Sequence, residues 1–523
     1  MSSKLHPQRS SLHNKGNAKE ALSKKSVFDP KKLSIGSYII HCLLQNNAHD
    51  IFGVPGDYIL SFFTLLEQSP LNVITTTRED SAGFAADAYA RIKGIGSLCV
   101  TYNVGGLNVV NAVACAYAEK SPVVVICGSP GVNERINDPL LHHKVRNFNT
   151  QLKIFEQLCI SVAVLSDPET AFQEINRVFE DVTQLKRPGY IELPRDMVNV
   201  IPSTYARLKR KILMTGDLEK LCEAVNEVVL HLSKCKKPVM LVGVEIQRYG
   251  LQDELQALAE ALRIPVAATL LGKSVLDEKH AQYIGVYGGV YSDKEVNEFV
   301  ENSDCIMIIG TIMSDVNTGM FSANLDPKMC INVSEDDFVI CGRKYDRTNL
   351  QDFIHILLKQ VPKITERHIP ECLQQKKKTL LSLEGTAPIT IARAISLLNQ
   401  KLDPNTIVVA EIGDSLFSAG IGLKTIGQGK FIGSAYYASM GFSIPATLGV
   451  QVASPSSRVV SICGDGSFQM SGMELSTIVR QKLNPIIVIF DNNGYGMQRA
   501  LKPGKWKFND ILPWKYSKIV EVL

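Results

Sequence analysis

The sequence predicts an α/β protein made of three consecutive doubly wound domains, each built on a parallel sheet. The chain has 523 residues, of which 45% are hydrophobic, and this length exceeds what one hydrophobic core usually supports. Short runs that are apolar on both faces alternate with amphipathic helical stretches along the chain. This alternation is expected of parallel strands that are covered by helices on both sides.

The first domain is expected over residues 33–205. Apolar residues recur at helical spacing in LSIGSYIIHCLLQNN, which predicts a helix. Strands are predicted for DIFG, NVITTT, SLCVTYN and PVVVICG, and helices for SAGFAADAYARIKG and GGLNVVNAVACAYAEK. Gly94 is the expected C-cap of the first of these two helices, because glycine adopts the left-handed conformation that ends many helices.

The central and third domains repeat this alternation over residues 215–385 and 386–523. Central strands are expected at PVMLVG, IPVAAT and CIMIIG, and the polar segment 371–386 is the expected linker. No GxGxxG fingerprint occurs between 215 and 385, so we predict neither a nucleotide nor a flavin there. The third domain is expected to place strands at TIVVAEIGDS, VVSICGDG and PIIVIFDNNG, and one helix over residues 470–483. The chain stops in SKIVEVL, inside an expected element, so we expect this domain to be short at its C-terminus.

The charge is unevenly distributed. Residues 1–32 carry eight Lys or Arg against two acidic residues, which leaves a net charge of −2 on the rest of a chain whose total is +4. We interpret 1–32 as a basic disordered arm, with a mitochondrial presequence as the minor interpretation. The near-neutral body predicts no nucleic-acid partner. The absence of a long apolar run predicts no membrane span, and twelve cysteines without a CxxC pair favour a reduced, cytoplasmic protein.

A magnesium site is predicted from two turns of the third domain. Asp465 lies in GDGS and Asn492 in DNNG, each directly after an apolar strand, and the spacing between them fits one helix and one returning strand. Both side chains are therefore expected at the carboxyl edge of one sheet. Carboxylate, amide and carbonyl oxygens suit Mg²⁺, which usually completes its shell with water and phosphate oxygens. Gly464 and Gly466 would let the backbone approach a diphosphate closely. Either motif alone is usually just a turn.

These motifs resemble those of the thiamine-diphosphate-dependent 2-keto acid decarboxylases of the pyruvate, indolepyruvate and phenylpyruvate type. The resemblance runs from about residue 33 to the end, through FGVPGDY, TREDSAGFAADAYARIKG, TYNVGGLNVVNAVACAYAE, LLHHKV, AEIGDSLFSAG, GDGSFQMSGMEL and NNGYGMQRAL. It implies thiamine diphosphate and Mg²⁺ as cofactors, and pyrimidine-binding, central and diphosphate-binding domains in that order. It also implies that Asp465, Asn492 and the carbonyl of Gly494 bind the metal. The further cofactor contacts that it implies are Asp414, Ser415, Gly464, Gly466 and Ser467.

The resemblance assigns roles to three more cofactor contacts. Glu79, which alone would be read as an exposed turn residue, would hydrogen-bond the aminopyrimidine ring and favour the tautomer that removes the thiazolium proton. Met440 would hold the coenzyme in a bent shape, although it is equally read as a core methionine. The carbonyl of Ala438 would accept a hydrogen bond from the exocyclic amine of the ring.

A proton-relay group is expected from Asp57, His142 and His143. Adjacent histidines are usually solvated loop residues, and an aspartate at position 57 would more commonly cap a helix. The decarboxylase branch of the family carries such a histidine pair above the reactive carbon, together with an aspartate from the GDY turn. The resemblance therefore implies that these three residues move protons and stabilise charge around the reacting atoms.

The sequence departs from the family in the expected substrate pocket. Gln498 occupies a position that is glutamate in many members, and an amide cannot donate a proton as an acid. Leu416 matches a position that is often tryptophan in pyruvate-specific members, which favours a larger 2-keto acid. Ile412 and Met497 match further pocket positions, and each would otherwise be read as core.

The sequence therefore predicts a carboxy-lyase that converts a 2-keto acid to an aldehyde and CO₂. Gln498 keeps open a carboligase that forms acyloins, and the basic arm and short C-terminus keep open a weakly active cofactor-binding protein. The resemblance further implies a site shared between two chains, with Glu79 of one facing Asp465 of the other. A homodimer is then the minimal unit, and we expect it to pair into a homotetramer.

Overall fold

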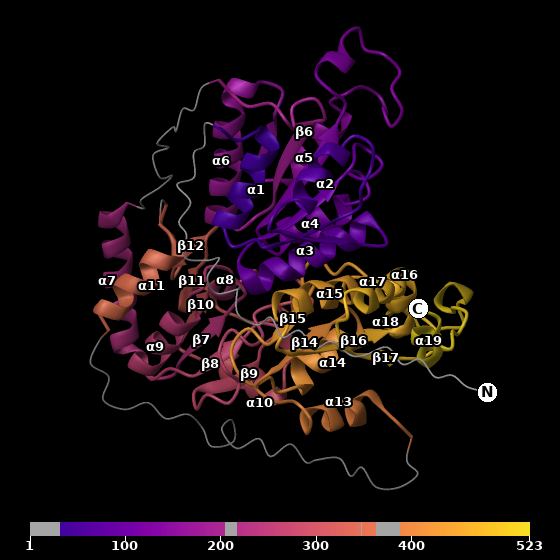
Figure 1. The fold of residues 1–523 in the computed structure, drawn as a ribbon. Coiled ribbons are helices and arrows are strands. Elements are labelled where there is room, and N and C mark those ends of the chain that lie inside the picture. The colour runs from indigo at the N-terminus through magenta and orange to yellow at the C-terminus, as the bar shows by residue number, and fades with distance from the viewer. Residues whose placement is uncertain (1–31, 204–216, 347, 362–387) are drawn as a thin grey trace, which may run out of the picture.

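Figure 1 shows the computed structural model, which describes residues 32–203, 217–346, 348–361 and 388–523. The predicted arm and the predicted linker lie outside these residues, except for Lys32. The ribbon forms three α/β regions, coloured indigo to purple, magenta to salmon, and orange to yellow along the chain. Three sheets form the centres of these regions, so the predicted fold class is confirmed. No helix among the described residues has the length and apolar character needed to cross a membrane.

The first sheet has six parallel strands in the order β2-β1-β3-β4-β6-β5. Its central strand β4 is buried throughout, and alternate side chains point to opposite faces. Val124 and Ile126 join the core beneath α1, α2 and α6, whereas Val123 and Val125 join the core beneath α3 and α4. The elements are α1 (Ile35–Gln45), β1 (Asp50–Gly53), α2 (Leu60–Glu67), β2 (Asn72–Thr75), α3 (Glu79–Lys93), β3 (Gly96–Val100), α4 (Val110–Ala118), β4 (Val123–Ser129), α5 (Thr150–Leu158), β5 (Ser161–Val164), α6 (Pro168–Leu185) and β6 (Gly189–Pro194).

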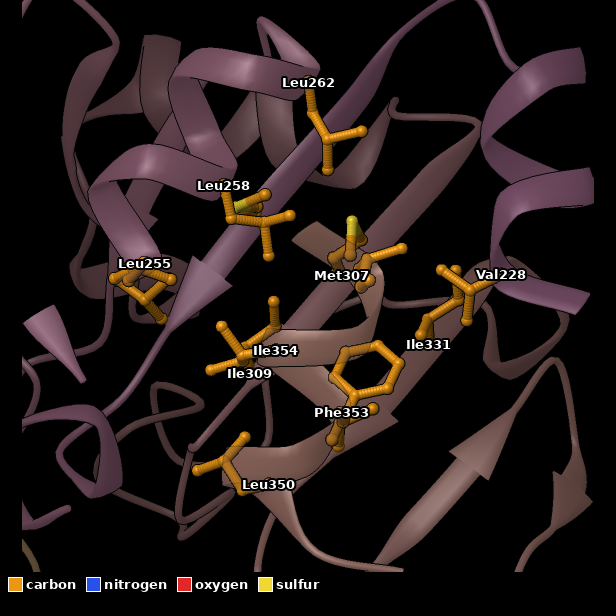
Figure 2. Close-up of a cluster of buried hydrophobic side chains, with 14 of the residues drawn as sticks. Val228, Leu255, Leu258, Leu262, Met307, Ile309, Ile331, Leu350, Phe353 and Ile354 are labelled. Atoms are coloured by element: carbon orange, nitrogen blue, oxygen red, sulfur yellow. The ribbon is translucent and has the colours of Figure 1, made fainter. Parts of the chain in front are cut away.

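The second sheet has seven strands in the order β13-β12-β11-β10-β7-β8-β9. Its β11 to β9 part is parallel, while β12 and β13 add an antiparallel edge that we did not predict. Figure 2 shows the core between this sheet and its helices, including Leu258, Ile309 and Phe353. The elements are α7 (Leu218–Lys234), β7 (Pro238–Val242), α8 (Glu245–Arg248), α9 (Gln252–Leu262), β8 (Val266–Ala268), β9 (Tyr283–Val286), α10 (Lys294–Glu301), β10 (Cys305–Ile309), β11 (Cys330–Val333), β12 (Phe338–Ile340), β13 (Arg343–Lys344) and α11 (Leu350–Lys359).

The third sheet has four parallel strands in the order β15-β14-β16-β17. The prediction of a single helix over 470–483 is wrong in detail. Helix α16 begins at Asp465, and a 3-10 turn at 472–474 separates α16 from α17. Phe468 packs so tightly over Gly472 that an added Cβ would lie 2.6 Å from the ring. The elements are α13 (Ile391–Asn399), β14 (Thr406–Ala410), α14 (Asp414–Gly422), β15 (Phe431–Gly433), α15 (Ser443–Ala453), β16 (Arg458–Gly464), α16 (Asp465–Ser471), α17 (Leu475–Arg480), β17 (Ile486–Phe490), α18 (Gly496–Leu501) and α19 (Ile519–Val522).

The first and third domains meet where α3 lies against α15 (Figure 1). Helix α3 begins with two acidic residues and ends at Gly94, which has a φ of 88° as expected of a C-cap glycine. Small residues on both helices allow close approach, and a Cβ added to Gly449 would lie 2.1 Å from the carbonyl oxygen of Ala85. This contact fixes how the two domains sit relative to one another.

We predict that Gly449→Ala destabilises the protein by about 1–3 kcal/mol, because the new methyl group would push two packed helices apart. The measurement is the midpoint of thermal unfolding, followed by circular dichroism. Gly288→Ala is the matched control, since an added Cβ there has its nearest neighbour at 3.8 Å. An unchanged midpoint for Gly449→Ala would contradict the close packing of α3 on α15.

Candidate active site

A cavity of about 290 Å³ opens at the carboxyl ends of β14, β16 and β17. Parallel strands present loops and helix N-termini at this edge, where ligands of open α/β sheets bind. The cavity brings together nearly all the site residues predicted from the third domain. They are Ile412, Asp414, Ser415, Ala438, Met440, Gly464, Asp465, Gly466, Ser467, Asn492, Gly494, Met497 and Gln498.

Leu416 is the exception among the predicted pocket residues. It is fully buried in the core between β14 and its neighbours, and it is not among the residues that line the cavity. An added Cβ on Gly433 would lie 2.6 Å from Leu416 Cδ1, so the leucine packs against β15. In this chain Leu416 therefore supports the cavity wall from behind, and its size does not directly set the space in the cavity.

Asp465 is the most deeply buried carboxylate of the cavity wall, with 1% of its surface exposed. Its Oδ1 accepts a hydrogen bond from the Gly466 amide at 2.8 Å, and its Oδ2 accepts one from the Gly494 amide at 3.0 Å. No lysine or arginine of the described chain pairs with it. Because a buried carboxylate without a positive partner is costly, this carboxylate fits a bound cation.

The turn that carries Asn492 and Gly494 has an unusual backbone. Gly494 has a φ of 146°, and an added Cβ would lie 1.9 Å from the Asn509 carbonyl oxygen, so only glycine fits there. Arg499 fixes the turn by donating to the carbonyl oxygens of Asn492 at 2.9 Å and of Asn493 at 2.7 Å. The turn is thus held in place by the chain itself, next to the Asp465 carboxylate.

Glycines also leave room between the acidic and amide side chains. An added Cβ on Gly496 would lie 2.9 Å from Asp414 Oδ2 and 2.6 Å from Asn492 Nδ2. An added Cβ on Gly464 would meet nothing within 4 Å, so the space in front of the β16 end is open. An all-oxygen donor set beside glycine backbone fits a hydrated Mg²⁺ and a diphosphate.

Two buried glutamates that the sequence reasoning did not single out hold the loop with Ala438 and Met440. The carboxylate of Glu119, from the end of α4, accepts from the amides of Tyr436 at 2.9 Å and Tyr437 at 3.0 Å. The carboxylate of Glu411, directly after β14, accepts from the amides of Ile412 at 3.1 Å and Ser443 at 2.9 Å. A charged residue inside an otherwise apolar stretch is the sequence signal that could have found both.

The predicted proton-relay residues form a group on the first domain. Asp57 contacts both histidines: its carboxylate hydrogen-bonds the His142 ring and lies 3.7 Å from His143 Nε2. The Tyr58 ring stacks on His142 with 4.7 Å between the centroids, and Asn103 donates to the His143 carbonyl oxygen at 2.5 Å. Asp57 does not cap α2, whose N-cap is Ile59 without a side-chain bond. The alternative role for Asp57 is therefore not observed.

Glu79 is the first residue of α3 and is only partly buried. Asn108 donates to its Oε2 at 2.6 Å, and the amide of Thr77, two residues earlier, donates to Glu474 of the third domain at 3.2 Å. These contacts fix the start of α3. Among the described residues that line the cavity, none comes from the first domain. Within one chain, Glu79 and the Asp57 group therefore do not complete the wall that Asp465 begins.

The features of the site define a class of protein. Three α/β domains carry, at the carboxyl edge of the last sheet, an acidic, glycine-lined cavity suited to a metal and a diphosphate. Such a site is typical of an enzyme that uses a diphosphate-bearing coenzyme.

Comparison of the sequence with models of known protein families identifies the family of this chain. Three models match: "Thiamine pyrophosphate enzyme, N-terminal TPP binding domain" over residues 33–151, the central domain over 225–361, and the C-terminal TPP binding domain over 411–513. The chain belongs to the thiamine pyrophosphate enzyme family, as its motifs suggested.

Curated relatives resemble nearly the whole chain. An indole-3-pyruvate decarboxylase of Azospirillum brasilense is 35% identical, over 93% of this chain and 88% of the relative. Pyruvate decarboxylase isozyme 2 of Saccharomyces cerevisiae is 30% identical, over 94% of this chain and 88% of the relative. Pyruvate decarboxylase 3 of Arabidopsis thaliana is 32% identical, over 95% of this chain and 85% of the relative.

Burial shifts the pKa of one carboxyl at the cavity in a way that can be measured. Desolvation raises the pKa of Glu411 from 4.5 to about 7, against backbone hydrogen bonds that lower it. The folded state then holds more protons than the unfolded state between these two values. The contribution of Glu411 to stability is fully present below about pH 4.5 and is lost as the pH rises through about 7.

We predict that Glu411→Gln changes the pH dependence of stability. Relative to the wild type, the free energy of unfolding of the variant should rise by up to about 3 kcal/mol between pH 4.5 and pH 7. Denaturant titrations across this pH range measure the free energy of unfolding of both proteins. Subtracting the wild-type value from the variant value removes the contribution of all other titrating groups. Parallel curves for the two proteins would show that Glu411 does not titrate in this window.

Proposed function

We propose that this protein is a thiamine-diphosphate-dependent carboxy-lyase that converts a 2-keto acid to an aldehyde and CO₂ without oxidation. The observation that carries the proposal is the buried Asp465 carboxylate, which shares the cavity wall with Asn492 and glycine backbone and pairs with no lysine or arginine of the described residues. The names of the relatives, which are indolepyruvate and pyruvate decarboxylases, support the substrate class. The family models support the coenzyme.

The residues of the cavity fit the cofactors. Asp465, Asn492 and the Gly494 carbonyl would bind Mg²⁺, while Asp414, Ser415, Gly464, Gly466 and Ser467 would surround the diphosphate. When bound, thiamine diphosphate supplies a carbanion that attacks the keto carbon and then accepts the electrons left by CO₂. Met440 and Ala438 would hold the pyrimidine end, because both lie on the loop at the cavity wall. Ile412, Met497 and Gln498 would contact the substrate.

The first-domain residues would handle protons. Glu79 would hydrogen-bond the pyrimidine ring, in an orientation that Asn108 fixes from behind. Asp57 keeps His142 oriented through its ring hydrogen bond, and His143 lies close enough to share the same carboxylate. Asp57, His142 and His143 would together supply and accept protons at the reacting carbon.

A homodimer would bring these two halves together. Of the part of the chain that the structure describes, no first-domain residue lines the cavity of the same chain, so the proposed site is complete only if a second copy presents its Glu79 and its Asp57 group. Exposed apolar residues near both halves, including Val104, Leu140, Met470 and Met473, support a surface that a second copy would cover. We further propose that two such dimers pair into a tetramer.

Gln498 favours a second candidate activity on the same coenzyme. It lines the cavity and is exposed, so its amide is placed to contact bound substrate. Since an amide cannot protonate a carbanion, the intermediate would live longer and could attack a second carbonyl to form an acyloin. A weakly active cofactor-binding protein remains the third candidate.

We also propose a basic arm at 1–32 and domains at 33–205, 215–385 and 386–523; the three sheets, one within each of these domain ranges, support the division into three domains. We propose a cytoplasmic location. No disulfide joins the cysteines of the described residues, and most of these cysteines are buried, which supports a reducing environment.

A mixed dimer tests the shared site. We predict that Glu79→Gln and Asp465→Asn each abolish decarboxylation of a panel of 2-keto acids, measured as CO₂ and aldehyde. A mixed dimer with one copy of each variant, isolated through two affinity tags, should regain about half of the wild-type activity, because one of its two sites is intact. A mixed dimer that stays inactive would place both residues in the same chain's site.

A second variant tests Gln498. We predict that Gln498→Glu raises aldehyde release by about 10-fold or more and lowers the share of acyloin, since a carboxylic acid can protonate the carbanion. Products are separated by chromatography after reaction with keto acids of increasing size. Gln256→Glu, on α9 of the central domain, is the matched control. An unchanged product ratio would remove Gln498 from the substrate site.

A further inference from the structure

We infer that Glu411 is a positioning residue: its carboxylate joins two loop segments that both line the cavity and thereby sets the geometry of the bound coenzyme. This inference rests on the proposed function, because it concerns how the same coenzyme is held. It adds a residue that does not itself line the cavity.

The position of Glu411 in the fold links two segments. It directly follows β14, and the next four residues, 412–415, all line the cavity. The second loop runs from Ala438 to Ser443, and Ala438 and Met440 line the cavity from there. One oxygen of Glu411 accepts from the Ile412 amide in the first segment, and the other accepts from the Ser443 amide in the second. The two segments are thus joined through a single side chain.

The backbone of both segments is irregular, so it needs such a support. Gly413 has a φ of 100°, Ala438 of 59° and Gly441 of 87°. A left-handed φ at a residue with a side chain, as at Ala438, costs free energy and persists only where the surroundings hold it. Sheet hydrogen bonds end at β14, and the Glu411 carboxylate supplies acceptors to amides beyond that point.

The chemistry of Glu411 suits positioning more than simple stabilisation. Its side chain is 1% exposed, and no lysine or arginine of the described chain pairs with it, whereas Glu119 beneath the same loop pairs with Arg91 at 2.9 Å. A buried carboxylate without a cation is an expensive way to fill space. Each carboxyl oxygen of Glu411 accepts a hydrogen bond from one of the two segments, whereas in glutamine one of these positions would be an NH₂ donor facing an N–H.

A shift of one loop relative to the other would change the distance between Met440 and residues 412–415. Reacting groups that are displaced by about 1 Å can lose about 100-fold in rate. Met440 and residues 412–415 would hold the coenzyme between them, and the coenzyme would supply the C2 proton whose removal starts the reaction. Exchange of that proton with solvent therefore reports the loop geometry without any substrate.

The test compares wild-type protein with Glu411→Gln and Glu411→Asp, each loaded with Mg²⁺ and thiamine diphosphate. The rate of exchange of the C2 proton for deuterium is measured by quenched flow and NMR, and the Kd of thiamine diphosphate by calorimetry. We expect Glu411→Gln to slow the exchange at least about 10-fold and to weaken coenzyme binding. Glu411→Asp, which keeps the charge on a shorter arm, should recover part of the rate and carries the test if the glutamine variant does not fold.

Glu278→Gln is the matched control. Glu278 is also a buried glutamate, but it pairs with Lys273 and Thr425 away from the cavity, so its exchange rate should equal that of the wild type. Wild-type exchange and affinity in both Glu411 variants would overturn the inference, as would equal slowing in the Glu278 variant. Wild-type protein that exchanges the proton but turns over no 2-keto acid would refute the proposed function and leave this inference standing.

Discussion

The arrangement of the three domains depends on one buried set of charges around Glu119 and Arg91. Arg91 on α3 pairs with Asp87 at 2.8 Å and with Glu119 at 2.9 Å, and all three side chains are almost fully buried. Arg91 also donates to the Gly433 carbonyl of the third domain, and Arg248 of the central domain donates to the Glu119 carbonyl. Removing one member would leave a partner charged and unpaired inside the protein. Each domain is therefore held to the others through groups that cannot move independently.

That same set of charges reaches the cavity. The Glu119 carboxylate accepts from Tyr436 and Tyr437, which lead into the segment with Ala438 and Met440. The close packing of α3 on α15 sets how near the first domain lies to the third domain, which carries this segment (Figure 1). The shape of the cavity is thus partly determined by residues of a different domain, although none of them lines it.

Two groups of site residues lie apart from each other within one chain. The residues proposed to bind the metal and the diphosphate lie at the carboxyl edge of β14, β16 and β17, where the strand ends of a parallel sheet present them together. Glu79 and the Asp57 group lie at the corresponding edge of the first sheet. This separation within one chain is the structural reason for proposing a homodimer, in which a second copy would complete the site.

The sequence by itself determined the alternation of strands and helices and the residues that end the strands. Asp465, Asn492 and the intervening helix–strand spacing placed two donors at one edge, because that edge follows from parallel topology alone. The break between α16 and α17, the antiparallel edge strands β12 and β13, and the burial of Leu416 behind the wall were decided only by tertiary packing. So were the roles of Glu119 and Glu411 as acceptors for distant loops. Long-range contacts of this kind depend on which surfaces meet, and local patterns of hydrophobicity do not contain that information.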